Sequence, residues 1–367
     1  MSARPKVLFI SPTVACYIGG TETVVSQLAR RMKDKVDLTV LSGDPGNGSK
    51  ALIAADGFTL ATIPFCGRDA RLNRVLSRVL MTSRFKIESH TFFRSLARSG
   101  IDLAAYDYIL TFYEADALLL EKQYPQLRAR FRHFLPGVSM RGFFRRVPAR
   151  DVVFFGYRAA PRAKRKWKVD VASLPLGVDE PFFPEAPPPF PLSFPSPRRL
   201  VFVGRLDKSK HIDWLADFFA ASGLAERGYL LDVVGDGPLM ESLREKHDRS
   251  PGIILHGRKR QDEVIGLLRE AFLLLHPTDL ESFGLTILEG MAAGIPVITH
   301  RLDSIEVWAH EHPRYAARLD AASWKQEILK FEDRAYWEST SAANLAFAKT
   351  FTWDRIADQV LELAMAR

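Results

Sequence analysis

The sequence predicts an α/β protein of two domains, each built on a doubly wound parallel sheet. Short β-rich runs alternate with helical runs along most of the 367 residues, which is typical of parallel sheets covered by helices. Residues 186–197 interrupt this alternation and are rich in proline. Because proline removes a backbone donor and fixes an extended chain, we interpret this segment as a linker. A long surface loop within one domain is the alternative; with a linker, a cleft between two Rossmann-like domains is expected.

The first domain is predicted to cover residues 1–185. Residues 6–14 are a short β-rich run, residues 19–32 place apolar side chains at helical spacing, and residues 36–43 form the next β-rich run. This strand–helix–strand order predicts parallel pairing. Further strands are predicted at residues 58–65, 106–116, 131–137 and 171–177.

The second domain is predicted to cover residues 198–350, where the alternation is more regular. Strands are predicted at residues 198–206, 229–238, 252–258, 272–278 and 296–300, and helices at residues 212–225, 239–247, 262–271 and 287–294. Residues 351–367 have the pattern of an amphipathic helix, with apolar side chains on one face. We expect this last helix to pack back on the N-terminal domain.

The composition is that of a globular protein, with 47% hydrophobic and 26% charged residues. No run of 18 apolar residues occurs, so no membrane-spanning helix is expected. The first apolar run is too short for a signal peptide. Cys16 and Cys66 are the only cysteines, and they give neither a disulfide framework nor a zinc spacing. We therefore expect a cytoplasmic protein.

The positive charge is concentrated in the first half of the chain. Residues 1–180 contain 29 Lys and Arg against 16 Asp and Glu. This excess predicts an anionic partner, which would be nucleic acid, anionic lipid or a phosphorylated substrate. Residues 68–86 have the pattern of a helix with a basic edge and an apolar face, and two further basic runs are residues 141–146 and 158–168. Such a helix suits the inner leaflet of an anionic membrane; a helix packed on its own domain is the alternative.

Two glutamates bracket a predicted helix start in the second domain. Glu281 follows a predicted buried strand, and Gly284 would open a helix near Leu285 that carries Glu289 about one turn later. The free N–H groups of Gly284, Leu285 and Thr286 would then form an anion site. Carboxylates repel phosphate but accept hydrogen bonds from hydroxyls. The pattern therefore predicts a ligand with sugar hydroxyls on both sides of a phosphate; a capping Glu281 and a solvated Glu289 are the alternative.

A basic loop follows the first strand of the second domain. Gly204 permits a sharp turn, and Arg205 and Lys210 follow it within one loop. Arg205 offers a planar fork for phosphate oxygens and Lys210 a point charge, so the pair could neutralise a diphosphate without a metal. No Asp-x-Asp occurs in the sequence, so no carboxylate-held magnesium is predicted. A solvated surface loop is the alternative.

Two further turns are glycine-rich. Gly19 and Gly20 open the first predicted helix, where backbone N–H groups could approach a phosphate or a sugar. Their spacing is not the dinucleotide fingerprint, and a plain flexible loop is the alternative. At residues 233–239, turn chemistry explains the glycines at least as well as ligand binding does.

Five motifs follow one another along the chain: GGTE, LPLGVD, VGRLDKSK, VVGDGPL and ESFGLTILEGMAAGIPVIT. With these motifs the sequence resembles, over nearly its whole length, the retaining nucleotide-sugar glycosyltransferases of the GT-B fold, of the group 1 or glycosyltransferase family 4 type. The resemblance implies two Rossmann-like domains facing across a cleft, with the nucleotide sugar held by the C-terminal domain. It also implies a hexosyltransferase that retains the anomeric configuration and requires no metal or other cofactor.

The resemblance assigns roles to residues that match the family's motifs. Glu289 matches the glutamate that hydrogen-bonds the ribose hydroxyls, and Glu281 matches the one that contacts the transferred sugar. Arg205 and Lys210 match the basic pair on the diphosphate, so these two and Glu281 are the predicted catalytic residues. The other predicted donor-binding residues match segments beside the base, the sugar or the phosphates: Gly19, Gly20, Gly204, His256, Gly257, Arg258, Phe283, Gly284, Leu285 and Thr286.

Two segments depart from the family pattern. Residues 300–306, HRLDSIE, stand where a pair of glycines usually follows the strand. Tyr113 and Glu114 stand where many relatives carry a histidine that lines the sugar pocket, and they are the predicted acceptor-side residues. In a retaining mechanism a phosphate oxygen can take the acceptor proton, so no general base is predicted.

The predicted donor is a UDP-sugar, with GDP-mannose next. The predicted acceptor is a glycan, a lipid-linked sugar or another glycoconjugate, as in polysaccharide or lipopolysaccharide biosynthesis. An anionic membrane is a further predicted partner, whereas nucleic acid is not, because the sequence shows no nucleic-acid-binding module. Paired glutamates also suit a glycoside hydrolase, which would not need the basic pair. A GT-B nucleotide-sugar epimerase and a non-catalytic GT-B protein that binds anionic glycan or nucleic acid are further alternatives.

Overall fold

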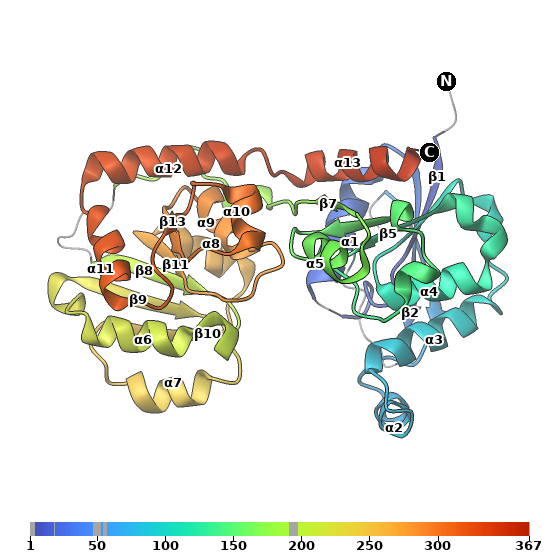
Figure 1. Cartoon of the computed structure of the whole chain (residues 1–367), viewed down its shortest axis with the longest axis horizontal. Helices are drawn as coiled ribbons and strands as arrows, with labels where there is room; N and C mark the ends of the chain where they lie inside the picture. The colour runs from blue at the N-terminus through green and yellow to red at the C-terminus, as the bar shows by residue number, and fades with distance from the viewer. Residues whose placement is uncertain (1–3, 18, 47–52, 54–56, 191–196, 367) are drawn as a thin grey trace. The chain divides into compact units, whose positions relative to one another are not determined.

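The computed structural model contains two α/β units, and each is built on a sheet of parallel strands (Figure 1). Unit 1 comprises Met1–Leu176 and Trp353–Arg367, and unit 2 comprises Gly177–Thr352. The predicted class of two parallel-sheet α/β domains is confirmed. The residues that the structure describes are 4–17, 19–46, 53, 57–190 and 197–366.

The sheet of unit 1 has seven strands in the order β3-β2-β1-β4-β5-β6-β7, and every neighbouring pair is parallel. The order reverses at β1, which pairs with β2 on one side and β4 on the other, as in a doubly wound sheet. The strands are β1 (Lys6–Ile10), β2 (Asp37–Asp44), β3 (Thr59–Pro64), β4 (Tyr108–Thr111), β5 (Phe131–Leu135), β6 (Val152–Phe155) and β7 (Ala172–Leu174).

Helices cover both faces of this sheet. Along β1, Val7 and Phe9 enter one core and Leu8 and Ile10 enter another, because alternate residues of a strand face opposite sides. The first core includes α1 and α13, which pack against each other, and the second includes α3 and α4. The helices of unit 1 are α1 (Gly20–Met32), α2 (Arg71–Val79), α3 (Arg84–Leu96), α4 (Glu114–Gln123), α5 (Ala159–Trp167) and α13 (Trp353–Met365).

The sheet of unit 2 has six parallel strands in the order β10-β9-β8-β11-β12-β13. Its strands are β8 (Arg198–Val203), β9 (Tyr229–Val234), β10 (Ile253–Gly257), β11 (Leu273–His276), β12 (Val297–Thr299) and β13 (Arg314–Tyr315). Its helices are α6 (Ile212–Ala221), α7 (Met240–His247), α8 (Gln261–Arg269), α9 (Leu285–Ala292), α10 (Asp303–Ala309), α11 (Ala321–Lys330) and α12 (Arg334–Ala348). The predicted helix start near Leu285 is confirmed.

Several elements were not predicted from the sequence; they include β6, β13, α10, α11 and α12. β6 is a continuous apolar run that is buried throughout, so it lacks the alternation of a half-exposed strand. β13 has only two residues. The helices α11 and α12 were not predicted, although each buries a tryptophan in the core of unit 2, Trp324 and Trp337 respectively.

The prediction of one helix over residues 68–86 is wrong. α2 ends at Val79, and Met81 adopts a positive φ of 44°. A new helix, α3, begins after Ser83, whose hydroxyl accepts a hydrogen bond from the backbone N–H of Lys86. This side-chain cap favours a separate helix start at that position.

The chain passes to unit 2 before the predicted end of the first domain at residue 185. Residues 177–190 belong to unit 2, where the carbonyl of Pro181 accepts a hydrogen bond from Arg269 of α8. The ring of Phe190, in the predicted linker, packs edge-on against Phe272 and Trp337 at centroid distances of 6.1 and 5.8 Å. Residues 191–196 of the predicted linker lie outside the described residues.

A glycine directly after β9 provides a test of the fold. Gly235 has a φ of +140°, and a Cβ at this position would lie 1.8 Å from the carbonyl oxygen of Gly204. We expect Gly235→Ala to lower the free energy of unfolding by about 2–4 kcal/mol, because it adds both backbone strain and a steric clash. Gly266→Ala is the matched control: it lies in α8 with open space around its Cβ and should stabilise by about 0.5–1 kcal/mol. Denaturant unfolding measures both, and equal stability of the two variants would contradict the close approach.

Candidate functional site

A groove of about 670 Å³ lies at the carboxyl edge of the unit 2 sheet. Ligands bind at this edge in open α/β sheets because the strand ends and the following loops meet there. The groove is formed by the last residues of β8 and β9, the residues that follow β8, β9 and β10, and one residue of α8: Val203, Gly204, Arg205, Val234, Gly235, Asp236, Gly237, Arg258, Lys259 and Val264. The structure thus brings together three of the predicted donor-site residues, Gly204, Arg205 and Arg258.

Two arginines at this groove, Arg205 and Arg258, have exposed side chains. The side chain of Arg205 is 70% exposed, and its Nε lies 3.3 Å from the Asp207 carboxylate. Arg258 is also exposed, whereas Lys259 is paired with Glu263 of α8 at 2.9 Å. The glycine-rich turn after β9, which the sequence did not distinguish from a structural turn, lines the same groove.

His256 does not line the groove. Its Nε2 lies 2.6 Å from Oδ1 of Asp232, which is fully buried on β9. Arg199 contacts the other oxygen of the same carboxylate at 2.9 Å. Of the three residues predicted to hold the base, His256, Gly257 and Arg258, only Arg258 lines the groove among the described residues.

The loop after β11 carries Glu281, which is held by two side chains. Lys210, in the loop after β8, forms an ion pair with Oε1 of Glu281, and both side chains are 16% exposed. His276, the last residue of β11, contacts the same oxygen through Nε2 at 2.8 Å. No hydrogen bond reaches Oε2 from the described part of the chain. This oxygen therefore remains available to a ligand.

The contacts of Glu281 decide its charge. Burial by itself raises the pKa of a carboxyl, but the hydrogen bond from His276 and the charge of Lys210 outweigh burial and lower the pKa of Glu281 to about 2. Burial lowers the pKa of His276, so its ring is neutral and Nε2 carries the hydrogen that it donates. Glu281 is therefore an ionised acceptor at neutral pH. His276 was not among the residues predicted from the sequence, because a histidine on a buried strand is more often a core residue than a site residue.

The start of α9 has open backbone donors. Gly284 adopts a φ of +92°, which favours glycine, and it precedes the first helical residue. Among the described residues, no acceptor binds the N–H groups of Gly284, Leu285 and Thr286, as expected for the first turn of a helix. The ring of Phe283 stacks on Trp308, whose Nε1 donates to the Phe283 carbonyl at 2.9 Å. Phe283 thus anchors the loop that presents these donors.

Glu289 lies one turn into α9. Burial raises the pKa of Glu289 to about 7, and the charge of Asp179 adds to this shift. No hydrogen bond to its side chain is present within the described ranges. The structure therefore does not support a helix cap by Glu281 or a fully solvated Glu289, since Gly284 precedes α9 and Glu289 is partly buried.

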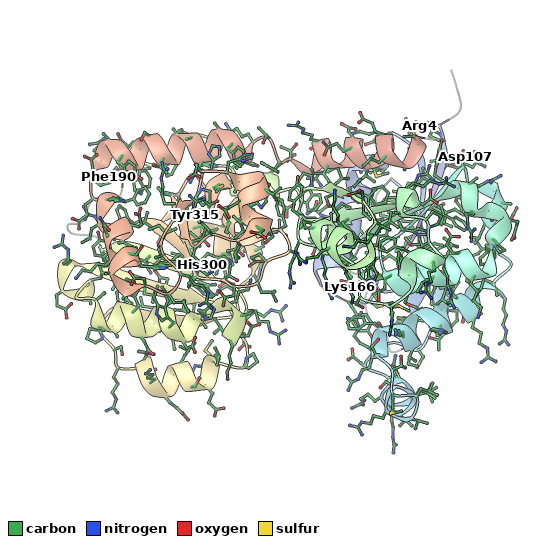
Figure 2. All side chains as sticks on the ribbon, viewed as in Figure 1. Arg4, Asp107, Lys166, Phe190, His300 and Tyr315 are labelled. Atoms are coloured by element: carbon green, nitrogen blue, oxygen red, sulfur yellow. The ribbon has the colours of Figure 1, made fainter. Side chains whose placement is uncertain are left out.

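A second group of contacts surrounds Asp279 in the same loop. The carboxylate of Asp279 accepts two hydrogen bonds from Arg318 and lies 2.6 Å from Nε2 of His211. The Arg318 guanidinium, together with His211, holds the pKa of Asp279 well below its usual range. His300, buried directly after β12, places Nε2 3.2 Å from Asp279 (Figure 2). His300 and His211 thus join the loops after β12 and β8 to Asp279 in the loop after β11.

In unit 1 the predicted residues gather around the buried carboxylate of Glu22. Oε1 of Glu22 accepts hydrogen bonds from Thr13 at 2.7 Å and from the hydroxyl of Tyr113 at 2.5 Å. A Cβ on Gly19 would lie 2.5 Å from Oε2 of Glu22, so Gly19 lies close to this carboxylate. Gly20 begins α1 and has open space around it.

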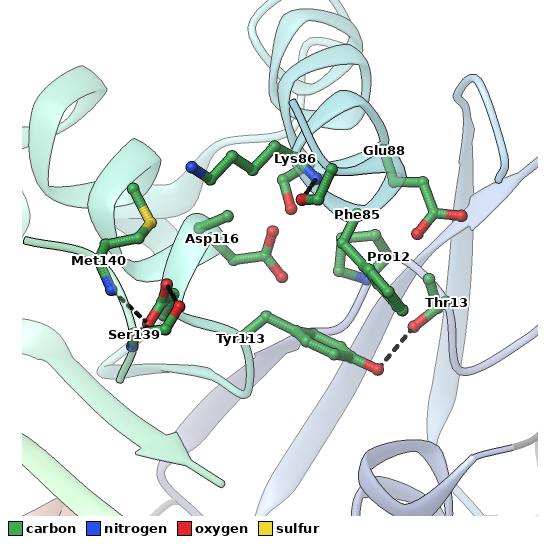
Figure 3. Close-up of a pocket in the computed structure, with 13 residues that line it drawn as sticks. Pro12, Thr13, Phe85, Lys86, Glu88, Tyr113, Asp116, Ser139 and Met140 are labelled. Atoms are coloured by element: carbon green, nitrogen blue, oxygen red, sulfur yellow. Dashed lines mark hydrogen bonds between the residues drawn. The ribbon is translucent and has the colours of Figure 1, made fainter. Parts of the chain in front are cut away.

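Tyr113 and Glu114 line one pocket of unit 1, with a volume of about 220 Å³ (Figure 3). Burial, followed by the charge of Glu22, raises the pKa of Tyr113 far above its usual value, so the hydroxyl keeps its proton. The carboxylate of Glu114 accepts hydrogen bonds from the backbone N–H and the hydroxyl of Ser139 at 2.5 and 2.8 Å. Glu114 thus fixes the loop after β5 at the edge of this pocket.

Comparison with known proteins adds a family match for unit 2. Residues 197–333 match the family model described as glycosyl transferases group 1. An uncharacterized glycosyltransferase of Methanocaldococcus jannaschii is 29% identical over 161 residues, which covers 42% of this chain and 44% of that protein. A GDP-mannose-dependent alpha-(1-6)-phosphatidylinositol dimannoside mannosyltransferase of Mycobacterium tuberculosis is 33% identical over 140 residues, which covers 37% of each chain. The chain thus covers less than half the length of these curated relatives.

Solved structures match nearly the whole chain. Sucrose-phosphate synthase from Thermosynechococcus elongatus matches with a TM-score of 0.73 and 17% identity over 98% of both chains. Anabaena HepE, in complex with UDP and glucose, matches with a TM-score of 0.69 and 15% identity over 99% of this chain and 100% of that chain. The chain has the GT-B fold. Within this fold, unit 2 is the part that is similar to the group 1 glycosyltransferases, because the family match covers residues 197–333.

The matched segment of the GT-B chain contains all the predicted donor-site residues of unit 2, from Gly204 to Glu289. The predicted residues of unit 1 lie outside it: Gly19, Gly20, Tyr113 and Glu114.

The low pKa of Glu281 predicts a pH-dependent contribution to stability. Because the folded pKa is lowered from 4.5 to about 2, the contribution is complete above about pH 4.5 and is lost as the pH falls toward 2. At pH 7, Glu281→Gln should reduce the free energy of unfolding by an amount on the order of 3 kcal/mol, and this difference should shrink in acid. Glu338→Gln on α12 is the control and should change stability by less than about 0.5 kcal/mol. Denaturant unfolding at several pH values is the measurement, and a constant difference for Glu281→Gln would contradict the assignment.

Proposed function

We propose that this protein is a retaining glycosyltransferase that moves a hexose from a nucleotide-diphosphate sugar to a glycan, a lipid-linked sugar or another glycoconjugate. One arrangement carries the proposal. At the carboxyl edge of the unit 2 sheet, a groove with exposed cations lies on the same edge as a helix N-terminus with open donors and a buried carboxylate with one open oxygen.

The diphosphate and the hydroxyls of a nucleotide-diphosphate sugar could each be bound by residues at this edge. The guanidinium groups of Arg205 and Arg258 can neutralise phosphate oxygens, and the open N–H groups of α9 favour an anion. Oε2 of Glu281 and the carboxyl of Glu289 can accept hydrogen bonds from hydroxyls. The transferred sugar and the ribose provide hydroxyls on opposite sides of the diphosphate.

Lys210 has a role that differs from that of a free cation. Its charge is paired with Glu281, so the pair is neutral as a whole. An ionised carboxylate can therefore stand near a diphosphate without the full repulsion that it would otherwise exert. We include Lys210 among the catalytic residues because removing it would leave a buried negative charge beside the leaving group.

The reaction would break the bond between the anomeric carbon and the diphosphate oxygen. Negative charge builds up on the departing diphosphate, where preorganised cations and backbone dipoles stabilise it. A phosphate oxygen can take the acceptor proton, so the proposal requires no enzyme base. It also requires no metal, because Arg205, Arg258 and the start of α9 supply the positive charge.

The proposed donor is a UDP-sugar, with GDP-mannose next. Anabaena HepE was solved with UDP and glucose, and the relative from Mycobacterium tuberculosis is GDP-mannose-dependent. Other similar proteins are an O-antigen chain mannosyltransferase B of Escherichia coli and WaaG, a glycosyltransferase involved in lipopolysaccharide biosynthesis. We therefore propose a role in polysaccharide or lipopolysaccharide biosynthesis, with the acceptor on the side of Tyr113 and Glu114.

The second proposed partner is a membrane surface. This proposal rests on α2, which buries polar side chains and exposes apolar ones. Its buried residues are Asn73 and Ser77, and Nδ2 of Asn73 donates to the carbonyls of Cys66 and Arg84 at 2.9 and 3.2 Å. Figure 1 shows α2 standing off from the rest of unit 1. Large apolar side chains are exposed on and beside it: Leu72, Val75, Val79, Leu80, Met81 and Phe85.

Arginines accompany this apolar face. Arg71, Arg74 and Arg78 all lie on α2, and basic residues beside an apolar face favour binding at an anionic lipid interface. Within the described residues, no helix is long and apolar enough to cross a bilayer. We therefore propose peripheral binding to the cytoplasmic leaflet through α2.

The donor site is tested by substitution at the groove. Arg205→Ala should lower turnover with the identified nucleotide sugar by about 100-fold, since it removes a charge that stabilises the transition state. Adding Lys210→Ala should abolish transfer, and Glu289→Ala should weaken donor binding. Arg260→Ala, an exposed cation paired with Asp262, is the control and should leave both unchanged. The measurements are a thermal shift with a panel of nucleotide sugars, then turnover; wild-type turnover in the first two variants would refute the assignment.

The membrane partner is tested by making α2 polar. Replacing Val75, Val79 and Leu80 by serine should weaken flotation with anionic liposomes by about tenfold or more, because it removes the apolar area that enters the lipid. Val307→Ser, an exposed apolar position of unit 2, is the control. Salt-resistant binding of RNA in a gel shift, with no flotation of the wild type, would count against a membrane partner.

A further inference from the structure

The pocket of unit 1 has an acidic lining, although the basic excess of the chain lies in the same half of the sequence. It forms where β1, β4 and β5 end, with the first half of α3 as a further wall (Figure 3). The charged residues that line it are Glu88, Glu114 and Asp116, with Lys86 as the one basic residue. Its volume of about 220 Å³ is below the range of about 300–1,000 Å³ for drug-sized ligands. It therefore suits one sugar ring or a small end group.

The carboxyl group of Asp116 accepts no hydrogen bond of good geometry from the described residues, although the Ser89 hydroxyl is near enough to lower its pKa. Asp116 lies in the first turn of α4 and is fully buried, and neither carboxylate oxygen is satisfied. Figure 3 shows its carboxyl group pointing toward the side of the pocket formed by Pro12 and Tyr113. Buried polar groups in proteins almost always have partners, so an open one in a pocket calls for a ligand that supplies them.

The other two carboxylates of the pocket, those of Glu114 and Glu88, differ in whether an oxygen remains without a hydrogen-bond partner. Both oxygens of Glu114 are taken by Ser139. In Glu88, Oε1 accepts hydrogen bonds from the backbone N–H and Nε of Arg68 at 2.5 and 3.0 Å, while Oε2 has no partner in the described part of the chain. The open oxygens of Glu88 and Asp116 therefore act as acceptors when the carboxyl groups are ionised.

The pocket offers little positive charge to an anion, since Lys86 is the one basic residue that lines it. Burial, and then the charge of Glu88, raises the pKa of Asp116 to about 7, although the Ser89 hydroxyl opposes the shift. Burial also raises the pKa of Glu88. Figure 3 shows the ammonium group of Lys86 on the side of Met140, away from Glu88. A phosphate in the pocket would meet two carboxyl groups, whereas a hydrogen-bond donor would satisfy them.

We infer that this pocket binds the hydrogen-bond-donating, non-anionic end of a ligand through Asp116 and Glu88. The donors would be the hydroxyls of a neutral sugar or the ammonium group of an amino sugar. Naming this ligand as the acceptor rests on the proposed function, but its chemical class does not. Anionic parts of the same ligand would lie outside the pocket, near basic surface helices such as α5, which carries Lys166 (Figure 2).

Saturation-transfer NMR on the whole chain would test three probes: methyl glucoside, glucosamine and glucose 6-phosphate. We expect at least one of the first two to bind, and glucose 6-phosphate to bind at least tenfold more weakly. Asp116→Asn, which keeps the shape and removes the charge, should weaken the non-anionic probe about tenfold, and Glu88→Gln should also weaken it. Preferential binding of methyl glucoside would identify hydroxyls as the donors, and preferential binding of glucosamine would identify the ammonium group.

Asp170→Asn is the control, because Asp170 is an exposed carboxylate of unit 1 paired with Lys164. It should bind all three probes as the wild type does, and thermal unfolding would show that each variant is folded. In this experiment the inference would be overturned by no binding of either non-anionic probe, by equal or tighter binding of glucose 6-phosphate, or by unchanged binding in Asp116→Asn.

The donor site must be measured separately on the same variants. Asp116→Asn should keep wild-type affinity for the nucleotide sugar in the thermal shift, and a loss there would place Asp116 in the donor site and overturn the inference. If instead the protein binds the non-anionic probes through Asp116 but shows no turnover with any nucleotide sugar, the proposed function fails and the ligand class of the pocket stands.

Discussion

The ion pair between Lys210 and Glu281 joins the two loops on which the site of unit 2 depends. Lys210 follows β8 and Glu281 follows β11, so the contact fixes the ends of two neighbouring strands against each other. His276 completes the pair from the end of β11 and leaves one oxygen of Glu281 open. A buried carboxylate is tolerated here only because a cation and a neutral histidine compensate it. The arrangement supplies an ionised acceptor in a position that is otherwise suited to an anion.

Two other carboxylates of unit 2 are also compensated by a cation and a histidine. Asp279 is held by Arg318 and His211, and Asp232 by Arg199 and His256. Carboxylates near the strand ends are thus largely neutralised within the protein, and the exposed guanidinium groups of Arg205 and Arg258 remain for a ligand. This balance explains how a unit with a slight excess of acidic residues can offer a site for a diphosphate.

Unit 1 shows the opposite arrangement, with basic helices outside and open carboxyl groups within its pocket. Net charge alone predicts an anionic partner for this half of the chain, and the exposed arginines of α2 agree with that prediction. The pocket does not, because Asp116 and Glu88 present acceptors without enough cations to balance them. The two observations are compatible if the outer surface and the pocket contact different parts of one ligand, or different ligands. Position within the fold, rather than composition, decides the chemistry of each surface.

The sequence by itself determined the alternation of strands and helices, the parallel sheets, the start of α9 and the motif residues around Glu281, because these depend on neighbours close along the chain. It missed β6, whose uniform apolar run lacks a period, and it joined α2 to α3. Only the tertiary structure decided that Glu281 binds both Lys210, 71 residues away, and His276, that His256 is directed to Asp232, and that α2 turns its apolar side outward. The physical reason is that burial and pairing depend on which distant segments the fold brings together. No local pattern distinguishes an unpartnered carboxylate such as that of Asp116 from one on the surface.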